Sequence, residues 1–288
     1  MPKKNRRKKT KRKTSKKRSK KKKAIKKTQK KNKRIKISKK KTKKGKEKND
    51  TTNELIIKTK PEWIKASLAN KSRYQKNYSE SIKNNEGFWK KEGKRINWIK
   101  PYKKIKEVKY SSKEVKIKWF HDGTLNASAN CIDRHLKDKK DKTAIIWVGD
   151  DPKDNQKISY KQLHQKVSKA ANGLKKLGIQ KGDRVTIYLT MIPELAILML
   201  ACARIGAIHS IIFGGFSPDS IAGRINDCKS DYVVTADEGI RGGKTIHLKS
   251  ITDEALMSCP NVKKCVVVKR TGNDVPIKNH CNKEWAEP

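Results

Sequence analysis

The clearest pattern of apolar and polar positions lies between residues 143 and 269. Five short apolar runs there have the length of β-strands: 144–148, 184–189, 207–213, 232–236 and 265–269. A segment with helical spacing or a helix-start signal lies in each of the four gaps between them: 159–177, 193–205, 218–228 and 252–257. Because strands that alternate with helices favour βαβ units, the pattern predicts an α/β fold with a parallel sheet.

Two of the expected helices have informative patterns. The helix after Ser159 has an N-capping residue type at its start, and Gly178 stands just beyond its last apolar position, where a left-handed residue is favoured. Its apolar residues fall on one face: Leu163, Val167, Ala170, Leu174 and Leu177. The helix that begins at Pro193 is apolar on all sides over residues 195–203, which predicts that it is packed inside, between layers.

The chain before residue 134 has a different character. Residues 1–50 are a low-complexity lysine tail, and residues 51–60 read as a linker. Ten aromatic residues then fall between Trp63 and Phe120. That density predicts a structured segment of helices and turns that docks on a larger body.

The net charge of +47 is concentrated in the tail. Residues 1–50 contain 30 of the 75 lysines and arginines against Glu47 and Asp50, a net of +28, which leaves +19 for the rest. This segment has four aliphatic residues beyond the initiator and no aromatic residue. It cannot bury enough apolar surface to offset the loss of chain entropy on folding, so the tail is expected to be disordered. A single basic globular domain is thereby excluded.

Three interpretations of the tail stay open. Its cations would bind nucleic acid without sequence preference and with steep salt dependence, although no aromatic residue is present to stack on bases. In a nucleated host the same lysines would serve as a nuclear import signal. The plainest alternative is a solvated extension without a selected function.

Membrane insertion and secretion are not expected. The most apolar stretch, residues 195–203, is far shorter than the roughly 20 residues that a bilayer span needs, and the N-terminus has no apolar core of a signal peptide. The six cysteines form no Cys-x-x-Cys pair, which favours reduced thiols and a cytoplasmic protein.

Two loops are candidates for chemistry, because ligands bind beyond the carboxyl ends of strands in an open parallel sheet. The first loop is 213–218. Gly214 and Gly215 let a ligand approach the backbone, the following helix start offers free N–H groups, and Phe213 or Phe216 offers a face for a flat ring. The alternative is a tight turn with two core phenylalanines.

The second loop is 238–244, in which Arg241 and Lys244 are separated by Gly242 and Gly243. Two cations on so short a loop are able to grip one phosphate or two adjacent ones, arginine as a fork and lysine as a point charge. The alternative is a solvated surface turn. Two such loops on one edge favour a phosphorylated, ring-bearing ligand, although neither is a Walker A loop or a Rossmann fingerprint.

Other motifs are weaker. Residues 133–135, Asp-Arg-His, are better explained as a capped or salt-bridged helix start than as a catalytic set. His209 lies in an apolar run and is expected in the core. No catalytic residue and no metal ligand is assigned.

Several blocks, taken in order, resemble the amino-terminal part of AMP-forming acetyl-coenzyme A synthetases of the adenylate-forming superfamily. They are residues 119–126, 130–135, 143–147, 158–160, 199–207, 212–218 and 237–244. The resemblance divides the chain into a basic tail and linker (1–60), an acetyl-CoA synthetase N-terminal segment (61–133) and an incomplete AMP-binding domain (134–288).

The resemblance implies an acetate–CoA ligase, which converts acetate, ATP and coenzyme A into acetyl-CoA, AMP and pyrophosphate. It also implies that Phe213, Gly214 and Gly215 line the nucleotide of coenzyme A and that the loop of Arg241, Gly242, Gly243 and Lys244 contacts its phosphates. Lys244 stands where the family often has arginine. It keeps the charge but loses the fork, which predicts weaker coenzyme A binding there.

The family's phosphate loop, its adenine and magnesium motifs, its acetate pocket and its mobile C-terminal domain are expected beyond residue 288. The chain is therefore expected to be the first half of an enzyme, with ATP and magnesium bound only in the complete protein. We expect no ATP–pyrophosphate exchange from it alone, and a complementary C-terminal half as its partner. A coenzyme A-binding remnant with regulatory use is a further alternative.

Overall fold

The computed structural model describes residues 58–276 and 282–284, in two compact units that divide after Asn70. The lysine tail that was expected to be disordered, with its nucleic-acid and import hypotheses, lies outside the described residues. Of the first unit, residues 58–70 are described, and they contain the short helix α2, Pro61–Ala66. Everything below concerns the second unit.

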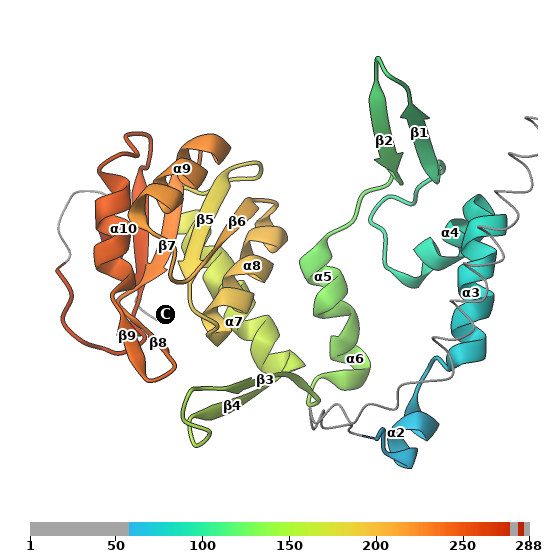
Figure 1. Cartoon of the computed structure of the whole chain (residues 1–288), viewed down its shortest axis with the longest axis horizontal. Coiled ribbons are helices and arrows are strands. Elements are labelled where there is room, and N and C mark those ends of the chain that lie inside the picture. The colour runs from blue at the N-terminus through green and yellow to red at the C-terminus, as the bar shows by residue number, and fades with distance from the viewer. Residues whose placement is uncertain (1–57, 277–281, 285–288) are drawn as a thin grey trace, which may run out of the picture. The chain divides into compact units, whose positions relative to one another are not determined.

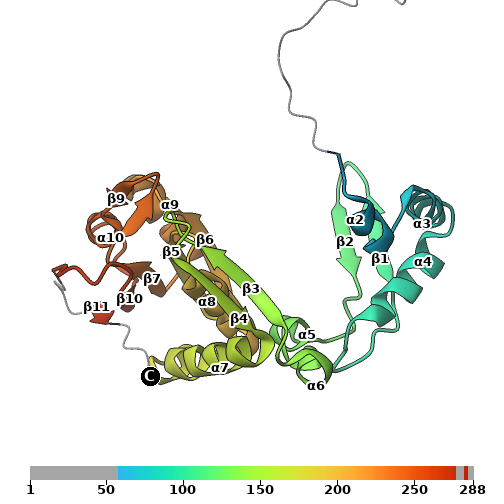
Figure 2. The ribbon, with the colours of Figure 1, turned by 90° about the horizontal axis from the view of Figure 1, so that it is seen from below.

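A five-stranded parallel sheet organises the carboxyl-terminal part of the second unit (Figures 1 and 2). Its order is β11-β10-β7-β5-β6, and every neighbouring pair is parallel. The strands are β5 (Arg184–Leu189), β6 (Ile208–Phe213), β7 (Tyr232–Ala236), β10 (Lys264–Val268) and β11 (Asn282–Glu284). All five residues of β7 are buried, as an inner strand covered on both faces requires. The α/β prediction is confirmed.

The crossover helices are α7 (Tyr160–Lys176), α8 (Pro193–Ile205), α9 (Pro218–Cys228) and α10 (Leu248–Leu256). The chain moves from β5 outward to β6, then turns back past β5 to β7 and on to β10. Because such crossovers are right-handed, α8 lies on one face of the sheet, and α9 and α10 lie on the other (Figures 1 and 2). The direction of winding therefore reverses at β5.

The ends of α7 and α8 form as their sequence signals predict. Ser159 and Gln162 form a reciprocal capping box at the start of α7, and Gly178 follows its last turn with φ +94°. Gly206 ends α8 in the left-handed conformation, with φ +80°. The apolar helix α8 is buried through six residues and packs against α7, β5 and β6, as expected: Pro193, Leu195, Ile197, Leu198, Ala201 and Cys202.

The strand expected at residues 144–148 is present as β3, Thr143–Val148, but it lies outside the parallel sheet. It pairs antiparallel with β4, Asn155–Ser159, which was not predicted. The physical reason is composition: β4 reads Asn-Gln-Lys-Ile-Ser and buries Ile158 alone, so no apolar run marks it as a strand. The helix expected at 252–257 also begins earlier, at Leu248.

The segment before the sheet contains a second unexpected hairpin. Its helical elements are α3 (Lys71–Lys83), α4 (Asn85–Glu92), η1 (Gly93–Arg95), α5 (Ala127–Cys131), η2 (Asp133–His135) and α6 (Leu136–Lys139). Between η1 and α5, β1 (Lys106–Tyr110) pairs antiparallel with β2 (Val115–Trp119). The expectation of helices and turns alone was therefore wrong, because the strict alternation in Val-Lys-Ile-Lys-Trp is a strand signal.

Asn126 joins this segment to the sheet domain. Its side-chain oxygen accepts a hydrogen bond from the Ala129 N–H and caps α5, while its amide nitrogen donates to the last carbonyls of α8, on Ala203 and Arg204, at 3.1 Å each. Arg204 in turn forms an ion pair with Asp133 at 2.6 Å. One amide thus satisfies the end groups of two helices.

Candidate functional site

The site is built where the direction of winding reverses, at the carboxyl ends of β5, β6 and β7 (Figure 1). Thr190 directly follows β5 and lies between the two glycine loops. A Cβ atom placed on Gly214 would lie 3.2 Å from the Thr190 methyl carbon, and one on Gly239 would lie 2.4 Å from it. The two loops can approach β5 this closely because both positions are glycine.

Tyr188, which is fully buried in β5, holds the first loop through two hydrogen bonds. Its hydroxyl accepts a hydrogen bond from the Gly215 N–H at 3.1 Å and donates one to the Phe216 carbonyl at 3.3 Å. Burial raises the pKa of this phenol above its ordinary value, so it stays protonated and able to donate. The loop is therefore a fixed feature of the sheet edge.

Phe213 is the exposed ring of this loop. It ends β6 with 54% of its surface accessible, whereas Phe216 is half-buried, and their ring centres are 6.0 Å apart. The alternative of a turn with two core phenylalanines is wrong for Phe213. An exposed ring on an otherwise ordered edge is available to a flat ligand.

The second loop is a β-hairpin. β8, Gly239–Arg241, pairs antiparallel with β9, Lys244–Ile246, and Arg241 is directly opposite Lys244. Gly242 and Gly243 form the turn with φ +57° and +71°, which favours glycine at both positions. Because opposite residues of an antiparallel pair project from the same face, the two cations stand side by side.

Arg241 also joins the two loops. Its guanidinium lies over the Phe213 ring, 5.0 Å from the ring centre, and a Cβ atom on Gly215 would lie 3.8 Å from its Nη1. Within residues 58–276, neither Arg241 nor Lys244 forms an ion pair. The structure thus brings the residues of both predicted loops together and leaves both charges available to a ligand.

The β3–β4 hairpin reaches the same edge. Asp150, in its turn, accepts a hydrogen bond from the Gly243 N–H at 3.2 Å. Asp154 forms an ion pair with Arg270 at 2.9 Å, and the Arg270 guanidinium lies 5.0 Å from the Trp147 ring centre. The β3–β4 hairpin therefore supports the glycine turn between Arg241 and Lys244.

Two buried carboxylates, Asp237 and Glu238, hold the backbone between β7 and the hairpin β8–β9. Asp237 is 1% exposed and accepts hydrogen bonds from four backbone N–H groups, those of residues 238, 270, 271 and 272. Glu238 accepts from the Asn273 amide at 2.7 Å and the Thr271 hydroxyl at 3.0 Å, and His247 Nδ1 lies 2.9 Å away. These hydrogen bonds, from Asn273 first and then Thr271, hold the pKa of Glu238 below its ordinary value.

Sequence reasoning placed the two loops but not their supports. Tyr188 lies within an apolar run, and Thr190 and Asp237 lie just after one, so residue type alone does not mark them as functional. Thr190 directly follows a predicted strand, and the rule that ligands bind beyond the carboxyl ends of strands would have included it. Of the weaker candidates, Asp133 forms an ion pair with Arg204 at a 3₁₀ start, as the salt-bridge interpretation expected, and lies 3.5 Å from His164 Nε2. His209 is half-buried on β6 and does not lie in the core.

Within the described ranges, 58–276 and 282–284, no helix is both long and apolar enough to cross a bilayer.

Comparisons with protein families define the class. The family described as AMP-binding enzyme matches residues 132–287, and the acetyl-coenzyme A synthetase N-terminus matches residues 74–131. The chain belongs to the AMP-binding enzyme family, and it carries the N-terminal region characteristic of acetyl-coenzyme A synthetases.

Individual relatives agree with this class. Acetyl-coenzyme A synthetase from Parvibaculum lavamentivorans is 55% identical over 81% of this chain and 36% of its own length. The enzyme of the same name from Mesorhizobium japonicum is 56% identical over 76% of this chain and 34% of its own length. The chain thus spans about a third of the length of the curated relatives that it matches.

A solved structure shows the same fold. Acetoacetyl-CoA synthetase from Streptomyces lividans superposes with a TM-score of 0.63 over 72% of this chain and 31% of its own, at 23% sequence identity.

Proposed function

We propose that this chain supplies the coenzyme A nucleotide site of an AMP-forming acetate–CoA ligase. The observation that carries the proposal is the arrangement of Arg241 and Lys244, two cations without ion-pair partners among residues 58–276, on one face of a hairpin beside the exposed ring of Phe213. A ligand that carries both a flat ring and phosphates matches this arrangement.

Each element of the site has a distinct task in the proposal. Arg241 and Lys244 neutralise the phosphates of coenzyme A, the arginine by a forked pair of hydrogen bonds. Phe213 offers its face to the adenine. Because the Arg241 guanidinium lies over that face, adenine binding requires it to swing toward the phosphates. Gly214, Gly215, Gly242 and Gly243 keep the backbone approachable.

Activation of acetate by ATP and magnesium is assigned, in this proposal, to a complementary C-terminal portion. The length of the relatives supports this division, since the chain spans 36% of the first of them. The free edge of β6 is where we place the contact. Two apolar side chains on that strand, Ile208 and Ile211, are more than 40% exposed, and β6 has one partner strand within the described sheet.

A chimera tests the proposal. The full chain is fused to the part of the Parvibaculum lavamentivorans enzyme that follows the matched region, and two activities are measured: acetate-dependent ATP–pyrophosphate exchange, which needs no coenzyme A, and acetyl-CoA formation. We expect both in the chimera and neither in the chain by itself. Exchange by the chain itself would contradict the division of labour.

The Arg241→Ala variant of the chimera separates the coenzyme A site from the rest. We expect unchanged exchange and a KM for coenzyme A raised about tenfold, because one charge-assisted pair is lost. Arg95→Ala, which removes an exposed arginine paired with Glu92, is the matched control and is expected to change neither activity. An unchanged KM in Arg241→Ala, or equal loss of exchange, argues against the site.

A further inference from the structure

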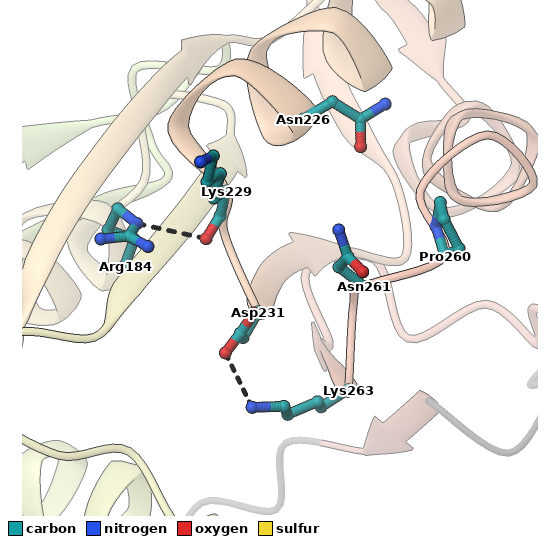
Figure 3. A pocket seen from close by; sticks show the side chains of 7 residues that line it. All are labelled: Arg184, Asn226, Lys229, Asp231, Pro260, Asn261 and Lys263. Carbon is teal, nitrogen blue, oxygen red and sulfur yellow. Dashed lines mark hydrogen bonds and ion pairs between the residues drawn. The ribbon is translucent and has the colours of Figure 1, made fainter.

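A second basic site lies at the opposite edge of the sheet, where the strands begin. A groove of about 700 Å³ opens between the end of α9 and the segments that lead into β7 and β10 (Figure 3). Arg184 is the first residue of β5, and Lys263 immediately precedes β10. The loops of the proposed coenzyme A site follow the last residues of the strands, so the two sites do not share a ligand.

Two cations on one side of the groove, Arg184 and Lys229, form no ion pair within residues 58–276. Arg184 Nε donates to the Lys229 carbonyl at 3.2 Å, which anchors the guanidinium (Figure 3). Its terminal amino groups form no hydrogen bond among the described residues. Lys229 ends α9 in the left-handed conformation, with φ +51°. Its ammonium is likewise without an ion pair in residues 58–276.

The other side of the groove carries a compensated pair and two amides. Lys263 forms an ion pair with Asp231 at 2.8 Å, and this hydrogen bond raises the pKa of the lysine. Asn226 donates to the Ser258 carbonyl at 2.9 Å, whereas the Asn261 amide has no hydrogen bond among the described residues (Figure 3). Three cations and one carboxylate give the lining a net charge of +2.

We propose that this groove binds the dianionic phosphate group of a small phosphate monoester. The charge of the lining matches a dianion, and the terminal amino groups of Arg184 form a fork that suits two phosphate oxygens. Lys229 adds a point charge, and the Asn261 amide adds a hydrogen-bond donor. No aromatic side chain lines the groove, so nothing there stacks on a nucleobase.

Amide NMR of the full chain tests the proposal, because it reports the groove separately from the lysine tail. Glycerol 3-phosphate, a dianionic monoester, and dimethyl phosphate, a monoanionic diester, are titrated at pH 8 and constant ionic strength. We expect saturable shifts at Asn226, Lys229 and Asn261 with the monoester only. Linear shifts without saturation, or an equal response to the diester, would overturn the proposal.

Variants identify the groups that carry the binding. Arg184→Gln and Lys229→Gln are each expected to weaken monoester binding about tenfold, as the loss of one charge-assisted contact implies. Asp231→Asn is expected to strengthen monoester binding, because it removes a negative charge from the groove and the ion-pair partner of Lys263. Lys161→Gln, an exposed lysine on α7, is the control. Lys229→Gln keeps the backbone carbonyl that anchors Arg184, so it remains decisive if Arg184→Gln does not fold. Affinities equal to that of the control would refute the site.

Discussion

Close contacts between single residues set the geometry of the carboxyl edge of the sheet, where the two glycine loops lie. Thr190 lies against both Gly214 and Gly239: a Cβ atom would be crowded at Gly214, at 3.2 Å, and would clash at Gly239, at 2.4 Å. Tyr188 then ties the first loop to β5 through two hydrogen bonds. The positions of Phe213 and Arg241 therefore depend on residues that do not touch a ligand in the proposal.

Substitution of Gly239 by alanine tests this packing. The added methyl group would lie 2.4 Å from the Thr190 methyl carbon, so we expect a loss of about 1–3 kcal/mol in the free energy of unfolding, measured by urea denaturation. The second substitution Thr190→Ser removes that methyl group and is expected to restore most of the loss. Gly223→Ala, at a helical position with open space around it, is the control. Equal stability of wild type and Gly239→Ala would contradict the contact.

Glu238 is expected to make the free energy of unfolding fall at acid pH. Its pKa lies below the ordinary 4.5 in the folded chain, because Asn273 and Thr271 donate to the carboxylate and His247 faces it. A depressed pKa stabilises the fold fully above the ordinary value, and this stabilisation is lost as the pH falls through the folded pKa. We therefore expect the unfolding free energy of wild type to decline below pH 4.5.

Glu238→Gln isolates that contribution. It is expected to be less stable than wild type at pH 7 and to show a shallower decline on acidification, in urea titrations from pH 7 to pH 3. Neighbouring Asp237 is present in both proteins, so the comparison isolates Glu238. Glu254→Gln, on the exposed side of α10, serves as control and should follow wild type. If the unfolding free energies of wild type and Glu238→Gln declined equally below pH 4.5, the hydrogen bonds to Glu238 would not contribute to the acid dependence of stability.

The site could be predicted from sequence as far as local signals reach. Gly214, Gly215 and the Arg241–Lys244 turn are marked by residue type, and the carboxyl-edge rule places both loops on one side. The stacking of Arg241 on Phe213 and the support from Asp150 and Arg270 depend on long-range contacts. No local pattern encodes them.

Among the elements, α7 shows how end signals and an apolar face specify a helix together. Ser159 accepts from the Gln162 N–H, and the Gln162 side chain accepts from the Ser159 N–H at 2.8 Å. The buried face then packs α7 against α8 and beside β3 and β4. This helix agrees with its prediction because every local signal and the tertiary packing point to the same structure.

Removal of the cap measures one of those signals. Ser159→Ala is expected to lower the free energy of unfolding by about 1 kcal/mol, because an N–H at the helix start loses its acceptor. Ser250→Ala, at an exposed position within α10, is the control and is expected to change stability little. The measurement is urea denaturation of both variants beside wild type. Equal losses in the two variants would argue against a capping effect.

The elements that were missed share a physical cause. β4 is polar, β1 reads Lys-Glu-Val-Lys-Tyr, and β2 alternates apolar residues with lysine. None of the three has the continuous apolar run that marks a buried parallel strand. β8 and β9 are three residues each and depend on a glycine turn. The parallel strands β5, β6, β7 and β10 were thus predictable from their apolar runs, whereas the missed hairpin strands have no such run and carry at most the alternation seen in β2.

For the whole molecule, the +47 charge has separate components. The tail lies outside the described residues, so its binding of nucleic acid and its role in nuclear import stay predictions. The remaining +19 includes Arg241 and Lys244 at the carboxyl edge of the sheet and the three cations that line the groove. The division of the chain at residues 60 and 133 likewise stays a prediction.

The most direct test of the account is a coenzyme A titration of the full chain, followed at the amides of Gly214, Gly215, Gly242 and Gly243. These signals exclude binding to the lysine tail. We expect saturable shifts at both loops, with an affinity about tenfold lower in Arg241→Ala and unchanged in Arg95→Ala. Shifts confined to the tail, or the same affinity in Arg241→Ala as in wild type, would contradict it.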